Sequence, residues 1–339
     1  QDLAAVLRRL GRRYIVLAGH PDTSDVVGEL AAWARAASAL TRLREQKTGL
    51  VGQPFESMGD FQVPLETLEA EFGIQVREID VGDVTKAAAE LSNDEIQAER
   101  ADWQQRFEWQ EPSGEAVEAT LRTCLGLRRC LGNAGCTPFS VNFQAFTDET
   151  GVPTVPFLEA SLAMARGGGY AGEGDVLTAS FCGALNAVWG ETTFTEMFCA
   201  DWANDTVFMS HMGECNLALA EGKPRLIQKP YKFSSVADPL IAVFKLKPGP
   251  ALLVNFSPGP GDQIDIVTAQ VEIVDRPPTE NFREVPHFWI TPREMGVADF
   301  LRRYSECGGT HHSVIMHGNR LGDLRKFARI AGLKLQVIC

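Results

Sequence analysis

The stretch TGLVGQPFESMGDFQVPLETLEAEFGIQVREIDV, residues 48–81, decides the fold class. Residues 48–52 (TGLVG) predict a short strand. Residues 65–72 have apolar side chains at helical spacing, and residues 76–81 are again a short strand pattern. Strands and helices that alternate at this length predict an open, mostly parallel sheet.

The same alternation extends to both sides of this stretch. Upstream, residues 14–18 (YIVLA) predict a buried parallel strand, and residues 25–43 predict a helix. We therefore expect residues 1–190 to form a doubly wound central α/β sandwich domain around a mostly parallel sheet. The downstream segments expected in it are helices at 83–110, 114–132, 155–166 and 175–188, a strand at 139–146, and a Gly-rich turn at 167–174.

The composition changes after about residue 190. The later runs are rich in β-forming residues, and Pro-Gly turns separate them at 247–250 and 257–261. We expect residues 191–339 to form a C-terminal, β-rich α+β domain with antiparallel, barrel-like strands. Its expected elements are strands at 240–246, 251–256, 263–274 and 334–338, and helices at 292–307 and 321–331.

Composition and charge exclude several classes of protein. The 339 residues are 45% hydrophobic and 22% charged, which is typical of a globular chain of about two domains. We see no signal peptide and no apolar run long enough for a membrane helix. The net charge of −12 makes nucleic acid an unlikely partner. Eight cysteines without a C-x-x-C motif predict buried, reduced thiols and a cytoplasmic location. The first residue is Gln, which suggests a processed, trimmed or incomplete chain.

The candidate chemistry lies in scattered carboxylates and imidazoles. Glu173 stands between two glycines, so its carboxylate either approaches a ligand closely or is a charge at a helix start. His211 follows an apolar run, and the pair His311–His312 follows two glycines. If His211, one of that pair, Glu173 and Glu196 converge, they form a mixed nitrogen and oxygen site suited to Mn²⁺, Co²⁺ or Fe²⁺.

Two other chemistries are weaker. Gly167, Gly169 and Gly172 match G-x-G-x-x-G, but a predicted helix precedes them where a dinucleotide site needs a strand. An NAD-dependent oxidoreductase is thus a minor alternative. A cysteine hydrolase using Cys307 is disfavoured, because that cysteine stands where a helix ends before two glycines.

Five segments, in order and spacing, resemble the L-arabinose isomerase family of the L-arabinose/L-fucose isomerase group. The resemblance continues through residues 49–63 and 321–338, so it covers nearly the whole chain. The five segments are GYAGEGDVLTA (169–179), TTFTEMF (192–198), VFMSHMGECN (207–216), EGKPRL (221–226) and GGTHHSVIMHG (308–318).

The resemblance implies a metal-dependent isomerase that converts an open-chain aldose to a ketose, L-arabinose to L-ribulose or a related pair, through a cis-enediol. It implies that Glu173, Glu196, His211 and His312 hold the ion, usually Mn²⁺. Glu173 and Glu196 would also act as catalytic acid and base, because the C1–C2 proton transfer needs both. The alternative is a non-catalytic paralogue that binds a sugar or a metal.

More loosely, the resemblance implies that Phe146, Met58 and His311 line the sugar pocket. It also implies a cytoplasmic homo-oligomer, a trimer or hexamer, of carbohydrate metabolism, with no membrane partner. The family carries a further α/β domain before the equivalent of residue 1, which this sequence does not contain, and continues after the equivalent of Cys339.

Overall fold

A four-stranded parallel sheet organises the first half of the chain in the computed structural model, which describes residues 1–56 and 58–338. Every neighbouring pair in it is parallel. The chain runs outward from β1 to β2 and then back past β1, so right-handed crossovers place helices on both faces. The expected α/β fold with parallel strands is confirmed. The order is β2 (Gln75–Ile79), β1 (Lys47–Val51), β4 (Cys136–Val141) and β5 (Tyr170–Gly172).

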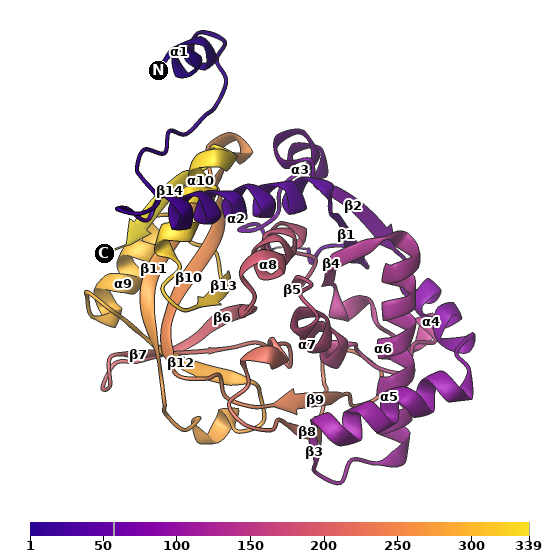
Figure 1. The fold of residues 1–339 in the computed structure, drawn as a ribbon. Coiled ribbons are helices and arrows are strands. Elements are labelled where there is room, and N and C mark those ends of the chain that lie inside the picture. The colour runs from indigo at the N-terminus through magenta and orange to yellow at the C-terminus, as the bar shows by residue number, and fades with distance from the viewer. Residues whose placement is uncertain (57, 339) are drawn as a thin grey trace.

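Helices cover this sheet from two sides (Figure 1). One group contains α2 (Val26–Glu45), α3 (Leu65–Phe72) and α8 (Val176–Trp189). The other contains α4 (Val81–Ala89), α5 (Asn93–Arg106), α6 (Gly114–Ala134) and α7 (Phe157–Ala165).

The single helix expected over 83–110 is wrong, because α4 and α5 are separate helices. Ser92 caps α5 in a capping box with Glu95, and this arrangement starts a new helix. The strand expected over 139–146 is also too long. It ends at Val141, where Asn142 caps the short 3₁₀ helix Phe143–Ala145.

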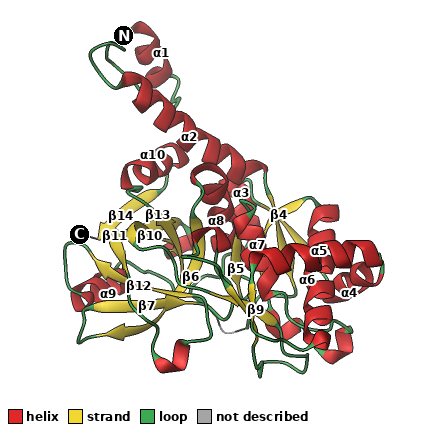
Figure 2. Ribbon diagram, turned by 60° about the horizontal axis from the view of Figure 1, so that its bottom comes forward, coloured by secondary structure: helices red, strands yellow, loops and turns green. Residues whose placement is uncertain are grey.

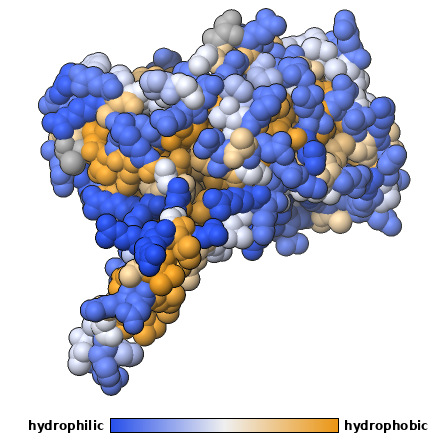
Figure 3. Space-filling model, turned by 90° about the horizontal axis from the view of Figure 1, so that it is seen from above, coloured by the Kyte–Doolittle hydropathy of each residue, from blue (hydrophilic) through white to orange (hydrophobic). Residues whose placement is uncertain are grey.

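The strand expected at residues 14–18 is wrong. The segment is an irregular connection in which Val16 is 69% exposed. It lies beside α2 and α10 (Leu321–Ala331) rather than at a sheet edge, and Arg13 donates to the carbonyl of Ile330. The run therefore has no strand to pair with. The helix α1 (Asp2–Arg9) projects beyond it, and Figure 3 shows hydrophobic side chains along this projection.

A seven-stranded mixed sheet forms the second half of the chain. All its pairs are antiparallel except β11–β14, and β10 also pairs with β11. The β-rich character is confirmed, whereas the barrel-like arrangement and the domain boundary at residue 190 stay predictions. The order is β10 (Gly249–Pro258), β13 (His312–His317), β6 (Thr192–Asp201), β7 (Thr206–Ser210), β12 (His287–Pro292), β11 (Ile264–Val274) and β14 (Lys334–Ile338).

Smaller elements complete the fold. The helix α9 (Val297–Glu306) starts later than expected, because Pro292 still belongs to β12. The third sheet contains β3 (Glu108–Trp109), β8 (Arg225–Gln228) and β9 (Leu240–Val243). The remaining 3₁₀ helices are Asp148–Thr150, Leu217–Leu219, Pro260–Asp262 and Glu280–Phe282.

The two large sheets meet through α8, which packs against strands of both (Figure 2). None of the helices in residues 1–56 and 58–338 is long and apolar enough to span a bilayer. The seven cysteines among these residues are free thiols, as expected, but only four of them are buried: Cys130 and Cys307 are half-buried and Cys199 is exposed. The eighth, Cys339, lies outside the described residues.

Candidate metal centre

Three neighbouring strands of the seven-stranded sheet bring three of the predicted ligands together. His312 on β13 lies opposite Glu196 on β6, and Glu196 lies opposite Ser210 on β7. His211 follows Ser210 directly. Side chains opposite one another in an antiparallel pair have Cβ atoms about 5 Å apart. The register of β13 and β6 therefore places His312 beside Glu196. His211 stands at the end of β7, with its ring centroid 5.9 Å from that of His312. Glu196 and His211 remain predicted ligands, because the described residues whose potential ligand atoms lie within 4.8 Å of one another are Glu173, His311 and His312.

Glu173 reaches the same place from the parallel sheet, directly after β5. Its backbone has φ = +63°, a conformation that a side chain bearing Cβ rarely adopts. Two hydrogen bonds hold it there: its N–H donates to the carbonyl of Val141 at 2.8 Å, and its carbonyl accepts from Phe55 N–H at 3.0 Å. This backbone strain is maintained where the carboxylate meets the histidines.

The glycines beside Glu173 are required by close packing. A Cβ on Gly172 would lie 2.8 Å from Cε1 of His211. A Cβ on Gly174 would lie 2.4 Å from the Cα of Pro54. The sequence pattern thus reflects the close approach of the turn to a histidine and to the loop after β1.

A buried carboxylate anchors each of the two predicted histidine ligands. His312 Nδ1 donates to Asp175 Oδ2 at 2.9 Å, and His211 Nδ1 donates to Glu214 Oε2 at 2.9 Å. Both carboxylates are fully buried. An ionised carboxylate only accepts hydrogen bonds, so in the neutral imidazole Nδ1 carries the proton and Nε2 has the lone pair.

The anchoring carboxylates are themselves held. Asp175 also caps α8, because its Oδ1 accepts from Thr178 N–H at 2.8 Å. Glu214 accepts from the Tyr170 hydroxyl at 2.7 Å. The ring of Phe194 lies edge-on to both histidines, with centroid distances of 4.7 and 4.9 Å. These contacts fix the direction in which the histidines present Nε2.

The donor set fits a divalent cation. Nε2 of His312 is buried and has no hydrogen-bond partner within the described parts of the chain, 3.7 Å from Glu173 Oε2. One potential ligand atom from each of Glu173, His311 and His312 lies within 4.8 Å of the others. The ring centroids of His211 and His312 are 5.9 Å apart. A buried nitrogen that lacks a partner beside a carboxylate suits Mn²⁺, Co²⁺ or Fe²⁺.

His311 is more closely engaged in this cluster than the sequence indicated. Its Nδ1 lies 2.6 Å from Asp60 Oδ2, and its Nε2 lies 3.4 Å from Glu173 Oε2. Partial burial lowers the pKa of His311, but Asp60 and Glu173 raise it more, to about 10. Burial raises the pKa of Asp60, but its bonds to His311 lower it more, to about 2. The pair is therefore an ion pair at neutral pH.

The pKa values of Glu173 and His211 are also shifted by the charged groups around them. Burial disfavours the charged form of Glu173, but His311, His312 and His211 outweigh it and lower the pKa of this carboxyl. Burial likewise opposes protonation of His211, yet Glu214 and the nearby Glu196 raise its pKa.

The remaining predicted residues lie at different depths. Glu196 is half-buried on β6. Phe146 is fully buried in the larger hydrophobic core, and Met58 is half-buried against that core. The sequence did not identify Asp60, Asp175 or Glu214 as partners of the histidines, because the residues in these pairs are mostly distant in sequence. Only Glu214, three residues after His211, had a local signal.

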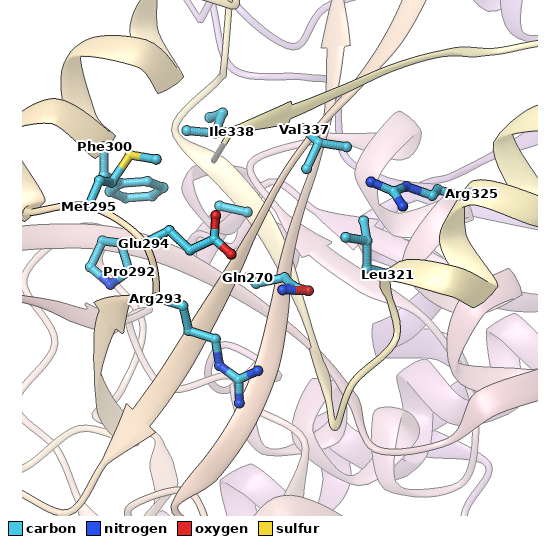
Figure 4. A pocket seen from close by; sticks show the side chains of 11 residues that line it. Gln270, Pro292, Arg293, Glu294, Met295, Phe300, Leu321, Arg325, Val337 and Ile338 are labelled. Carbon is cyan, nitrogen blue, oxygen red and sulfur yellow. The ribbon is translucent and has the colours of Figure 1, made fainter.

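One of two cavities borders the candidate site, and the other lies elsewhere. A cavity of about 720 Å³ lies under the loop after β1 and reaches Phe61 and Gly174. The pocket in Figure 4, of about 210 Å³, is instead lined by residues such as Phe300 and Arg325, and includes none of the predicted ligands.

Comparison with known proteins gives the same family along most of the chain. Residues 66–190 match the L-arabinose isomerase central domain, and residues 191–334 match the L-arabinose isomerase C-terminal domain. An L-arabinose isomerase of Nocardioides sp. is 28% identical over 100% of this chain and 69% of its own length. The L-arabinose isomerase of Klebsiella pneumoniae is 26% identical over 97% of this chain and 68% of its own length. L-arabinose isomerase 1 of Bacillus licheniformis is 27% identical over 97% of this chain and 67% of its own length.

These alignments cover nearly all of this chain and about two thirds of each relative. The two family models follow one another without a gap, in the order of the two large sheets. The predicted resemblance is confirmed: the chain belongs to the L-arabinose isomerase family of sugar isomerases.

Proposed function

We propose that this chain isomerises an open-chain aldose to the ketose, L-arabinose to L-ribulose or a related pair, with a bound divalent metal ion. One observation carries the proposal: His211 and His312 each have Nδ1 on a buried carboxylate, and Nε2 of His312 lies 3.7 Å from Glu173 Oε2. This arrangement is typical of imidazoles that bind a metal through Nε2. The family and the names of the relatives support the reaction class.

In this proposal Glu173, Glu196, His211 and His312 hold the ion. Mn²⁺ is the first candidate, and Co²⁺ or Fe²⁺ would suit the same nitrogen and oxygen donors. A bound divalent ion would supply electrostatic stabilisation to the oxyanion that develops as the aldose passes through the cis-enediol(ate).

The protein's own carboxylates move the proton. Isomerisation takes a proton from C2 and returns one to C1, so acid and base groups must lie within hydrogen-bond reach. Glu173 and Glu196 come from different sheets and would approach the sugar from two directions. The surrounding histidines lower the pKa of Glu173, so that carboxyl is in its ionised form at neutral pH, the form that can accept a proton.

The test is direct. The protein is loaded with Mn²⁺ and incubated with a panel of aldoses that includes L-arabinose, and the ketose formed is measured. We expect ketose from the wild type and none from Glu173→Gln or Glu196→Gln, with unchanged folding by circular dichroism. Mn²⁺ binding without ketose from any aldose would favour the non-catalytic paralogue. The cytoplasmic location and the homo-oligomer, a trimer or hexamer, stay predictions.

A further inference from the structure

The loop after β1, described over residues 52–56 and 58–61, contacts both halves of the candidate site. Its Phe55 N–H donates to the carbonyl of Glu173 at 3.0 Å. The ring of Phe61 stacks on His312, with centroids 5.0 Å apart and planes inclined by 17°. The same loop therefore contacts the strained carboxylate that follows β5 and the histidine that begins β13.

Asp60 makes the loop's strongest polar contact with the histidine pair. Its Oδ2 accepts from the backbone N–H of His311 at 3.1 Å and from the ring Nδ1–H at 2.6 Å. One oxygen thus fixes both the backbone and the ring of His311. The other ring nitrogen, Nε2, lies 3.4 Å from Glu173 Oε2 and makes the hydrogen bond to that carboxylate.

The position of Asp60 sets it apart from the other two carboxylates that anchor histidines. Asp175 and Glu214 are fully buried, whereas the Asp60 side chain is 40% exposed. Asp60 is also 251 residues away from His311 in the sequence. Because Asp60 is partly exposed, its two contacts with His311 lie at the edge of the site and not in the core, where they fix the geometry of the histidine.

We propose that Asp60 is a positioning residue of the isomerase: it holds His311 so that Nε2 keeps Glu173 Oε2 in one place. The proposal rests on the proposed function, in which Glu173 transfers the proton. A carboxylate whose oxygen is held cannot rotate freely about its last bond, so each transfer starts from one geometry. Without Asp60, the imidazole turns away and Glu173 loses this constraint.

The experiment compares Asp60→Ala, Asp60→Asn and a matched control, Asp22→Ala. Asp22 is an exposed carboxylate beside another histidine, His20, so its removal makes the same change of charge at a different place. In the Mn²⁺-loaded enzyme, we expect Asp60→Ala to lower kcat by about 10- to 100-fold and to leave KM within about threefold. The Asn amide oxygen can accept the same two bonds, so Asp60→Asn recovers most of kcat.

A second measurement does not depend on turnover. In the metal-free protein, the Nδ1 proton of His311 is hydrogen-bonded to Asp60 Oδ2, which slows its exchange with water. We expect its nuclear magnetic resonance signal in the wild type, in Asp60→Asn and in Asp22→Ala, and its loss in Asp60→Ala.

The inference is overturned if Asp60→Ala keeps kcat within threefold of the wild type. It is equally overturned if Asp60→Asn is as slow as Asp60→Ala, or if the proton signal survives in Asp60→Ala. Failure of the proposed function looks different, because the wild type then forms no ketose from any aldose while the proton signal still responds to Asp60→Ala.

Discussion

Replacing Gly172 by alanine tests whether His211 presents Nε2 to the proposed cation. The added Cβ would lie 2.8 Å from Cε1 and 3.2 Å from Nε2 of His211. Carbon atoms pack at about 3.5 Å, so the ring or the turn must move by about 0.7 Å. His211 is buried and fixed by Glu214, so it cannot rotate away without breaking that bond. Gly172 does not have a positive φ, so alanine adds no backbone strain there.

The expected loss of Mn²⁺ affinity follows from this displacement of the ring. Metal sites tolerate ligand shifts of only about 0.5 Å. We therefore expect Gly172→Ala to weaken Mn²⁺ binding by about 10- to 100-fold, which is about 1.4 to 2.8 kcal/mol. Isothermal titration calorimetry of the metal-free protein with Mn²⁺ measures this change. Gly132→Ala on α6 is the control, because its new Cβ meets nothing within 4 Å and replaces glycine within a helix.

A double-mutant cycle separates this local effect from general destabilisation. Removing the His211 ring makes room for the new methyl group, so Gly172→Ala should cost no further affinity in a His211→Ala background. Wild-type Mn²⁺ affinity in a folded Gly172→Ala protein would refute the reasoning. An equal loss of affinity in both backgrounds would also refute it, because the effect would then not act through His211.

Three further predictions concern the groups that support the site and the fold. Asp175 accepts from both His312 Nδ1–H and Thr178 N–H, and the amide of Asp175→Asn has only one oxygen that can accept. One of these buried donors is then left without an acceptor, so we expect Mn²⁺ affinity to fall by about 10- to 100-fold, measured by calorimetry. The Asp60–His311 pair stabilises the metal-free protein most between about pH 4 and 6.5, which are the ordinary pKa values of the two groups. Below pH 4 the contribution of Asp60 decreases and is lost as the pH falls through about 2. Above pH 6.5 the contribution of His311 decreases and is lost as the pH rises through about 10. Urea unfolding of wild type and Asp60→Ala across pH 4–10 should show the difference shrinking above pH 6.5. Arg128→Ala leaves the buried Glu159 with one fewer partner, so it should lower the free energy of unfolding by about 3 kcal/mol and leave Mn²⁺ affinity unchanged.

Local sequence patterns determined much of the fold. The segments 65–72, 321–331 and 334–338 were predicted with the bounds that α3, α10 and β14 have. Their periodicity and turn residues lie within the segments themselves. The apolar run 14–18 shows the limit of this reasoning, because a strand forms only where a partner strand lies beside it, and α2 and α10 lie there instead.

The candidate ligands were named from the sequence, but their meeting depends on how the two sheets dock. His312 and its anchor Asp175 are 137 residues apart, and no spacing within either segment shows that they touch. Only the register of β13, β6 and β7 and the strained turn after β5 bring Glu173 to the histidines. The sequence by itself therefore determined the residue types and the local elements. The tertiary structure decided that Asp175 anchors His312 and that Asp60 anchors His311, because those contacts form between distant segments, whereas His211 and Glu214 are only three residues apart.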